Sequence, residues 1–343
     1  MRLCWAFLLA SVLSYLCGFA VRASLARLGV LDRPNQRSSH DQPVMRGGGV
    51  GVLTAAAAAG ALSVSPGAVA GFYWIALACL ILAAVSFADD VRSVRHVIRL
   101  GVHAGAAIIA LWALGLGRPA SLQPVAAAAL AVVGFFWITG YTNAFNFMDG
   151  INGMAGMQVV ATGVGTALVA VAAGASPSHP AVILAVVLAG AGAGFLPHNF
   201  PRARMFLGDV GSAPLGFLLS VLAFWLARDL GWYLLGAFGL LHANFVLDTA
   251  VTLVRRIRNG EKCLESHRDH FYQLLVRAGK SHRFVTLLEG ALQGVALLVV
   301  LAAMRMGWGG RLASAAFVCA MWLAFFAYAG ARFRSRPAAA SAP

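Results

Sequence analysis

Three aspartates of this 343-residue chain could take part in chemistry most directly: the adjacent pair Asp89 and Asp90, and the distant Asp209. Asp89 and Asp90 close an apolar run that ends FADDVRSV, and they raise each other's pKa unless a positive group lies beside them. Arg92 or a divalent cation would provide that charge. Asp209, in FLGDVGS, is flanked by glycines near a helix start, where backbone amides can receive an anion. The three carboxylates therefore indicate chemistry on anions with help from a metal ion.

A second group of polar side chains recurs at every third residue of NAFNFMDGING. Asn143, Asn146, Asp149 and Asn152 follow this spacing, and on a helix the first three would share an arc of about 120 degrees. The glycines after Asp149 favour a broken helix that lines a polar cleft. Hydrogen bonds between membrane helices are the alternative explanation for such a polar stripe.

Basic residues and imidazoles lie in two further segments. Arg46 precedes three glycines, whose backbone allows close approach to a phosphate that Arg46 could hold. The segment ESHRDHFYQ brings together His267, Arg268 and His270, a group suited to a diphosphate or a nucleotide base. Zinc is disfavoured there, because the HxxH spacing lacks a third ligand. Asp248 is either a further site residue or the salt-bridge partner of a nearby arginine.

The elements that position these residues are membrane helices. The chain is 60% apolar and only 11% charged, with many apolar runs of about the 20 residues that a membrane helix needs. We therefore predict an all-α polytopic membrane protein, because lipid-facing backbone must satisfy its own hydrogen bonds. The predicted spans are eleven, at about 3–21, 47–64, 69–88, 98–115, 124–144, 155–174, 180–196, 212–228, 231–252, 284–304 and 309–331.

The arginines and lysines fix the predicted orientation. When loops are assigned alternately to the two sides, 21 basic residues fall on the side of the polar segments and 5 on the other. The richer side should be cytoplasmic, with the amino terminus outside and the carboxyl terminus inside. The net charge of +14 is thereby explained without nucleic acid as a partner. We expect one membrane domain over residues 1–335, a short disordered tail at 336–343, and no metal or redox role for the cysteines.

In their order and common sidedness, these segments resemble the polyprenyl-phosphate N-acetylhexosamine-1-phosphate transferase superfamily, which contains WecA and MraY. The resemblance covers nearly the whole chain, from Asp32 to His270. It implies an enzyme of the bacterial cytoplasmic (inner) membrane, with its active site on the cytoplasmic side. Such enzymes move a sugar 1-phosphate from a UDP-N-acetylhexosamine to undecaprenyl phosphate, release UMP and need Mg²⁺ or Mn²⁺. RGGG, NFMDGING and SHRDHFYQ are most similar to enzymes that begin O-antigen synthesis with amino sugars such as N-acetylfucosamine.

The resemblance also implies roles for single residues. Asp209 would be the principal metal ligand, with Asp90 beside it, and Asp89 and Asp90 would lie at the metal and the lipid phosphate. His270 matches the first histidine of the family's histidine-rich loop. The remaining implied contacts to substrate are Arg46, Asn143, Asn146, Asp149, Asn152, Asp248, His267 and Arg268. The chain departs from the family pattern at Asn152, where a second aspartate is common, and at Tyr272 and Gln273, which replace later histidines.

Two other classes of protein compete with this interpretation. A transporter or lipid flippase would place ionisable residues near the membrane midplane on broken helices, whereas the centres of these spans are almost free of charge. An inactive membrane scaffold would not need Asp89, Asp90 and Asp209. An ATP-hydrolysing enzyme is disfavoured, because no Walker motif is present. No pattern decides between a monomer and a homodimer, and membrane lipid is the expected surrounding.

Overall fold

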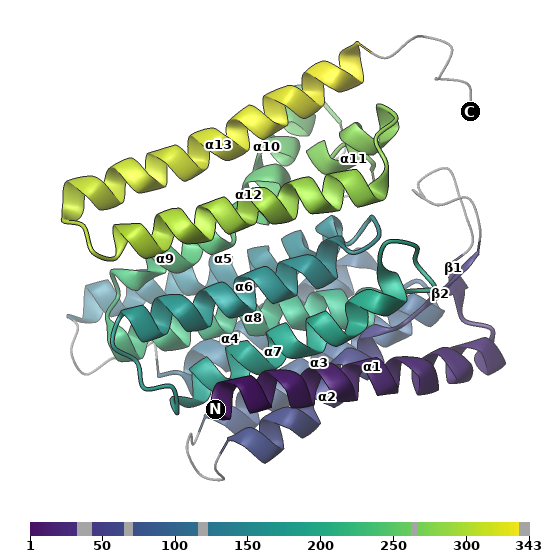
Figure 1. Ribbon diagram of the computed structural model, residues 1–343, viewed down its shortest axis with the longest axis horizontal. Helices are drawn as coiled ribbons and strands as arrows, with labels where there is room; N and C mark the ends of the chain where they lie inside the picture. The colour runs from purple at the N-terminus through teal and green to yellow at the C-terminus, as the bar shows by residue number, and fades with distance from the viewer. Residues whose placement is uncertain (33–42, 65–70, 116–122, 262–266, 336–343) are drawn as a thin grey trace.

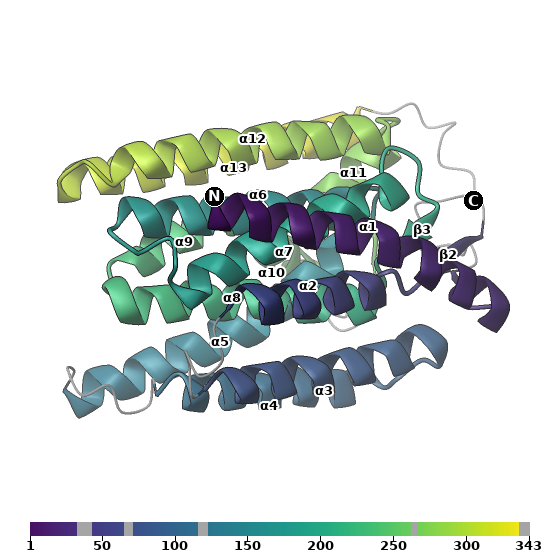
Figure 2. The same ribbon diagram turned by 60° about the horizontal axis from the view of Figure 1, so that its bottom comes forward.

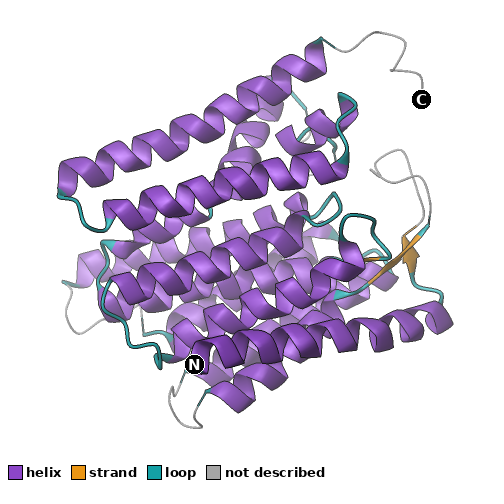
Figure 3. Cartoon of the chain, in the orientation of Figure 1, coloured by secondary structure: helices purple, strands orange, loops and turns teal. Residues whose placement is uncertain are grey.

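The computed structural model describes residues 1–32, 43–64, 71–115, 123–261 and 267–335, and these residues form a helix bundle with one small sheet (Figure 1, Figure 3). The prediction of an all-α polytopic membrane protein is confirmed, since 9 helices within the described ranges are long and apolar enough to cross a membrane. These helices are α1 (Arg2–Leu28), α3 (Phe72–Val91), α4 (His96–Ala113), α5 (Pro124–Met148), α6 (Met154–Ala172), α7 (Pro180–Asn199), α8 (Asp209–Leu230), α12 (His282–Ala303) and α13 (Trp308–Arg334).

Two of the eleven predicted spans have a different form. Helix α2 (Gly49–Ser63) is apolar but has only 15 residues. The span expected at 231–252 is divided into α9 (Leu234–Leu241) and α10 (Ala243–Arg258), which meet at a bend of 74°. A further short helix that we did not predict, α11 (Phe271–Arg277), follows His270. The predicted tail at 336–343 lies outside the described residues.

The centre of the bundle is α8. The most apolar 18-residue window of α8 is 94% buried, whereas the corresponding windows of α1 and α3 are each 22% buried. Helix α8 is therefore enclosed by other helices, and α1 and α3 face outward. Helices α3 and α5 pack against α8, and α7 packs against α1 and α6. Figure 2 shows the hairpin of α12 and α13 on one side of this centre and the pair α3 and α4 on the other.

The only strands among the described residues form a small sheet at one end of the bundle. Strand β2 (Val44–Arg46) pairs antiparallel with β1 (Leu31–Asp32) and parallel with β3 (Met205–Phe206). The register sets Arg46 opposite Phe206, three residues before Asp209. Strands this short leave no alternation in the sequence, which explains why the pattern did not predict them.

Glycines allow the sheet and the start of α8 to approach closely. A Cβ atom on Gly49 would lie 2.2 Å from the Cα of Gly211, so α2 and α8 can meet only without side chains here. Gly208 has φ 76°, and a Cβ there would lie 2.6 Å from Asp90 Oδ2. The RGGG and FLGDVGS segments are therefore neighbours in space.

The two ends of the described chain lie at opposite ends of the bundle, as an odd number of membrane crossings requires. Helices α1 and α13 both run towards the end of the bundle that carries β1, β2 and α11 (Figure 1). The first residue and the last helical residue therefore lie at opposite ends. The predicted site segments gather at the end of the bundle that carries the sheet, which is the end with the excess of arginine.

Candidate active site

Asp90 holds the start of α8 in place. Its Oδ1 accepts from the Asp209 N–H and its Oδ2 from the Val210 N–H, both at 2.9 Å. An aspartate that accepts two backbone N–H groups at a helix start offsets their lack of partners within the helix. The Asp90 side chain is also fully buried. Asp90 was predicted as a metal ligand, and in the structure its oxygens bind two backbone N–H groups and Arg46.

Arg46 joins Asp90 to Asp209. Its Nε lies 2.6 Å from Asp90 Oδ1, and its Nη2 lies 2.5 Å from Asp209 Oδ1. Burial disfavours the charged guanidinium, but the carboxylates of Asp209 and Asp90 outweigh this and raise the pKa of Arg46 above its usual range. Arg46 is therefore a permanent positive charge at this point.

Arg99 forms the second bridge. Its Nη1 donates to Asp89 Oδ2 and, at 2.9 Å, to Asp209 Oδ2. The other oxygen of Asp89 accepts from the Val94 N–H at 2.6 Å, which fixes the carboxylate at the turn between α3 and α4. The sequence did not single out Arg99, because a basic loop residue is already explained by membrane orientation. The signal that could have found it is the need of the aspartate pair for a positive partner, which we had expected to be Arg92 or a metal.

Of the three asparagines Asn143, Asn146 and Asn152, Asn146 alone is seen to donate to one of the three carboxylates described above. Asn146 Nδ2 donates to Asp209 Oδ2 at 3.3 Å, and Ser212 Oγ orients that amide by donating to Asn146 Oδ1 at 2.8 Å. Asn143 instead donates to the Thr139 carbonyl of its own helix. Asn146 is therefore the stripe residue that the structure brings to the carboxylates.

The remaining two polar residues of the segment have different surroundings. Asn152 Nδ2 donates to the Pro201 carbonyl at 3.1 Å, so this side chain ties the segment to the loop before β3. Asp149 is half-buried just beyond the end of α5. Burial, followed by the negative charge of Asp209, raises the pKa of Asp149 well above its usual range. Asp149 is therefore near enough to Asp209 for their charges to interact.

Asp248 and His270 form a second, adjacent centre. Asp248 is completely buried, and its Oδ1 lies 2.9 Å from His270 Nδ1. Its Oδ2 accepts from the Phe271 N–H at 2.9 Å, so the same carboxylate caps α11. Asp248 was predicted either as a further site residue or as the salt-bridge partner of an arginine, and the structure shows it as a buried carboxylate paired with His270.

The other residues of this loop surround the imidazole. The His267 and His270 rings lie 4.9 Å apart, and Arg268 accepts from Arg277 through its carbonyl. Burial, with the nearby His270 and Arg256, lowers the pKa of His267 to about 4, so His267 is neutral near pH 7. Gln273, which stands where the family has histidine, accepts from the His270 N–H at 3.3 Å and completes the cap of α11.

The two centres meet at the end of α5. The Phe147 ring stacks on His270 at 6.2 Å, and the Tyr272 hydroxyl donates to the Phe147 carbonyl at 3.0 Å. Gly150 leaves room for that hydroxyl, since a Cβ there would lie 2.1 Å from it. The structure therefore places the loop of His270 beside the segment that carries Asn146 and Asp149.

The carboxylates suit a magnesium ion that is shared with a substrate. The described ranges hold no group of three His, Cys, Asp or Glu side chains placed as a metal cage. Mg²⁺ keeps several waters and needs only one or two carboxylates in addition to substrate phosphates. Asp89 and Asp209 meet that need, because a single cationic nitrogen of Arg99 already contacts both. The residues present therefore fit the ion.

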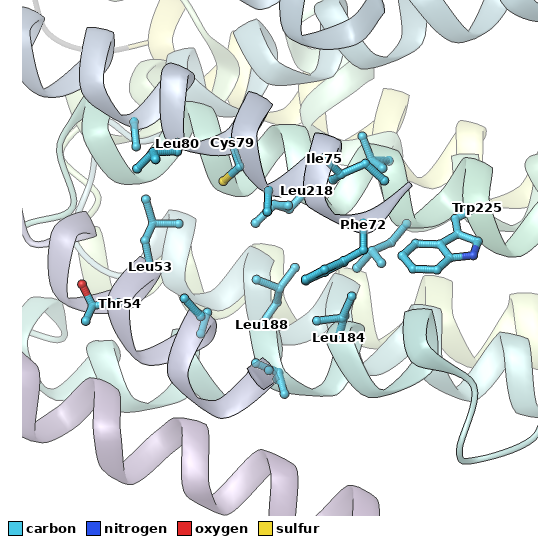
Figure 4. Close-up of a pocket in the computed structure, with 18 residues that line it drawn as sticks. Leu53, Thr54, Phe72, Ile75, Cys79, Leu80, Leu184, Leu188, Leu218 and Trp225 are labelled. Carbon is cyan, nitrogen blue, oxygen red and sulfur yellow. The ribbon is translucent and has the colours of Figure 1, made fainter. Parts of the chain in front are cut away.

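An apolar pocket elsewhere in the bundle lacks such chemistry. The cavity, of about 300 Å³, lies between α2, α3, α7 and α8. Figure 4 shows its lining, which includes Leu53, Phe72, Leu188, Leu218 and Trp225. None of the predicted site residues lines it, and its walls suit hydrocarbon rather than a nucleotide. The candidate active site is therefore at the loop end of the bundle.

Comparisons with known proteins decide the family. The sequence profile of glycosyl transferase family 4 matches residues 72–227, which carry Asp89, Asn146 and Asp209. A putative glycosyltransferase of Streptomyces coelicolor is 34% identical over 94% of this chain and 73% of its own length. The chain belongs to glycosyl transferase family 4.

Two further relatives within family 4 have more specific names. The decaprenyl-phosphate N-acetylglucosaminephosphotransferase of Mycolicibacterium smegmatis is 28% identical over 82% of this chain and 77% of its own. The probable undecaprenyl-phosphate N-acetylglucosaminyl 1-phosphate transferase of Bacillus subtilis is 27% identical over 78% of this chain and 75% of its own length. The predicted superfamily is confirmed, and this family 4 member is a multi-pass membrane protein and a transferase.

Proposed function

We propose that this protein transfers an N-acetylhexosamine 1-phosphate group from a UDP-sugar to undecaprenyl phosphate and releases UMP. The observation that carries the proposal is the pair Asp89 and Asp209, held together by one nitrogen of Arg99 at the ends of two apolar helices. The names of the Mycolicibacterium and Bacillus relatives support the same reaction. Such a site meets the membrane surface, where a lipid phosphate and a water-soluble nucleotide can both reach it.

In this reaction an oxygen of the lipid phosphate attacks the β-phosphorus of the UDP-sugar. The bond from the β-phosphorus to the oxygen that bridges the two phosphates breaks, and that oxygen leaves with UMP. The attacking phosphate is already ionised near pH 7, so a strong general base is not required. The work left to the protein is to neutralise charge and to align the attacking and leaving oxygens.

The charged side chains of the site divide this work. Asp89 and Asp209 would hold a divalent ion, Mg²⁺ or Mn²⁺, which supplies charge neutralisation for the phosphate oxygens. Arg46 and Arg99 present guanidinium groups that match phosphate oxygens in geometry and charge. Asn146, oriented by Ser212, donates to the same Asp209 oxygen as Arg99 and helps to fix the carboxylate. Asp90 acts on the reaction only by holding the start of α8 and Arg46 in place.

His270 is the candidate contact of the second centre with the diphosphate or the base. Its Nδ1 faces Asp248, so the proton on that nitrogen is held and Nε2 is the nitrogen that can meet a ligand. His267 and Arg268 lie in the same loop, next to the Asp149 segment. We assign them to binding of the nucleotide rather than to the transfer itself.

The donor sugar and the pathway belong to the same proposal. We infer an amino sugar as donor, with N-acetylfucosamine as the candidate that the resemblance names, and a place at the start of O-antigen or other envelope polysaccharide synthesis. We place the active site at the cytoplasmic face of the bacterial inner membrane, because the arginine-rich loops lie there. A panel of UDP-sugars, each incubated with purified protein, undecaprenyl phosphate and Mg²⁺ and assayed for UMP, tests the donor. UMP from none of the UDP-N-acetylhexosamines would contradict the proposal.

A further inference from the structure

A buried polar cluster lies where the broken span α9–α10 meets α6 and α12. Its members are Gln158 on α6, Asn244 on α10, and Glu289 and Gln293 on α12. Each of the four is 3% exposed or less. Glu289 is the eighth residue of α12, about 10 Å along the helix axis from its first residue. An acidic side chain enclosed at such depth is costly and marks a functional site.

The hydrogen bonds of this cluster engage its side-chain donors but leave several of its oxygen atoms without a partner. Asn244 Nδ2 donates to Gln158 Oε1 at 2.8 Å and to Glu289 Oε2 at 3.4 Å. Gln293 Nε2 donates to the Leu241 carbonyl at the end of α9. Three buried acceptors then lack a partner among the described residues: Asn244 Oδ1, Glu289 Oε1 and Gln293 Oε1. Each such acceptor costs free energy unless something positive or a donor reaches it.

The three side chains border a single small cavity. Asn244, Glu289 and Gln293 line it together with Gln158, Thr286 and apolar residues, and its volume of about 10 Å³ admits one particle the size of water. No ion pair among the described residues includes Glu289. Asp248, one turn along α10 from Asn244, is a second buried carboxyl group nearby. The cavity therefore combines three unpartnered oxygen atoms with a carboxyl group, Glu289, that no described ion pair includes.

We propose that this cavity binds one monovalent cation of the size of Na⁺ through the three oxygens of Asn244, Glu289 and Gln293. Hard cations prefer oxygen ligands, and broken membrane helices are typical places for such ions. One cation would contact all three oxygens and neutralise Glu289. A protonated Glu289 together with one water molecule also supplies three hydrogens for them, and it is the alternative that the binding experiment separates from the cation. The cation would tie α12 to α10 one turn from Asp248, which holds His270.

Equilibrium binding of radioactive Na⁺ to the purified full-length protein in detergent tests this inference directly. We expect saturable binding of one Na⁺ per chain, with K⁺ competing more weakly because the cavity is small. The assay does not depend on substrate or on the proposed reaction, so its outcome is separate from that of the UMP assay. An absence of saturable Na⁺ binding to the wild-type protein overturns the proposal and leaves a water molecule or a protonated Glu289 in the cavity.

Three variants locate the ion. Glu289→Gln should abolish binding, and Gln293→Met, which loses one oxygen ligand, should raise the Kd for Na⁺ by about tenfold or more. Asp229→Asn removes a carboxylate that pairs with Arg228 and His179 near the end of α8, and it should bind Na⁺ like the wild type. Thermal unfolding in NaCl against choline chloride at equal ionic strength gives a second readout for folded variants. Wild-type Na⁺ affinity in both Glu289→Gln and Gln293→Met would place the ion elsewhere and refute this site.

Discussion

Arg99 Nη1 donates to Asp89 and, at 2.9 Å, to Asp209 Oδ2, so one cationic nitrogen joins the end of α3 to the start of α8. The two carboxylates would repel each other without it. Arg46 provides the equivalent bridge from Asp209 to Asp90. The site is therefore a set of three carboxylates bridged by two guanidinium groups, which leaves one negative charge for a cation to neutralise. The predictions below remove parts of this set or of the adjacent centre at His270.

Arg99→Ala should lower the rate of UMP release by about 10²–10³-fold, because it removes a charge that faces the phosphates and leaves Asp89 and Asp209 opposed. Initial rates measured at saturating donor and acceptor test this. Arg92→Ala is the matched control, since Arg92 is an exposed arginine just after the end of α3 and its replacement should leave the rate unchanged. Equal rates for the two variants would remove Arg99 from the mechanism.

Asp90→Asn should destabilise the protein more than Asp89→Asn does. The NH₂ group of the asparagine would point at the N–H of Asp209 or of Val210, and two donors cannot form a hydrogen bond. The loss of this hydrogen bond at the start of α8 costs about 1–2 kcal/mol. Thermal unfolding in detergent, followed by tryptophan fluorescence, measures the difference. If Asp90→Asn unfolds at the wild-type temperature, Asp90 does not hold α8 as described.

Asp248→Asn should lower activity by at least about tenfold through misorientation of His270. The asparagine has one acceptor oxygen where the carboxylate has two, and with that oxygen on His270 its NH₂ group would face the N–H groups of Phe271 and Tyr272. A raised KM for the UDP-sugar in a variant that unfolds at the wild-type temperature separates this role from a loss of fold. Wild-type values of both the rate and the KM would show that His270 acts without Asp248.

Acid should loosen the His270 loop through His267. Burial and nearby positive groups lower the folded pKa of His267 to about 4, below its usual value in an unfolded chain. The stability that the neutral ring contributes is therefore complete above about pH 6.5 and is lost as the pH falls towards 4. Between pH 6.5 and 4.5 the unfolding temperature of the wild type should fall more steeply than that of His267→Gln. Parallel curves for the two proteins would contradict this.

The sequence predicted the helices well because lipid imposes a minimum apolar length, and that constraint is local. The bend between α9 and α10 was not predicted, because hydropathy does not register a change of direction within an apolar run. The carboxylates were predicted from their places at helix ends. Their partners were not, because Arg99 is ten residues from Asp89 and 110 from Asp209, and only the fold brings them together.

Two structural roles at the site were not predicted. Residue type alone suggested only that Asp90 would bind metal and that Asp248 would touch substrate. The structure shows both carboxylates accepting from backbone N–H groups at helix starts, Asp90 for α8 and Asp248 for α11. Glu289 went unnoticed because one acidic residue hardly changes the mean hydropathy of α12. Asp90 and Asp248 differ from Asp89 and Asp209 in their hydrogen-bond partners on distant segments. Residue type does not reveal those partners.

The central claim is tested most directly by UMP release from purified wild-type protein and from Asp209→Asn, with undecaprenyl phosphate, a UDP-N-acetylhexosamine and Mg²⁺. The account predicts release by the wild type that requires the lipid phosphate and stops with EDTA, and no release by the folded variant. Release of UMP by Asp209→Asn at the wild-type rate, or by the wild type without lipid phosphate, would contradict it.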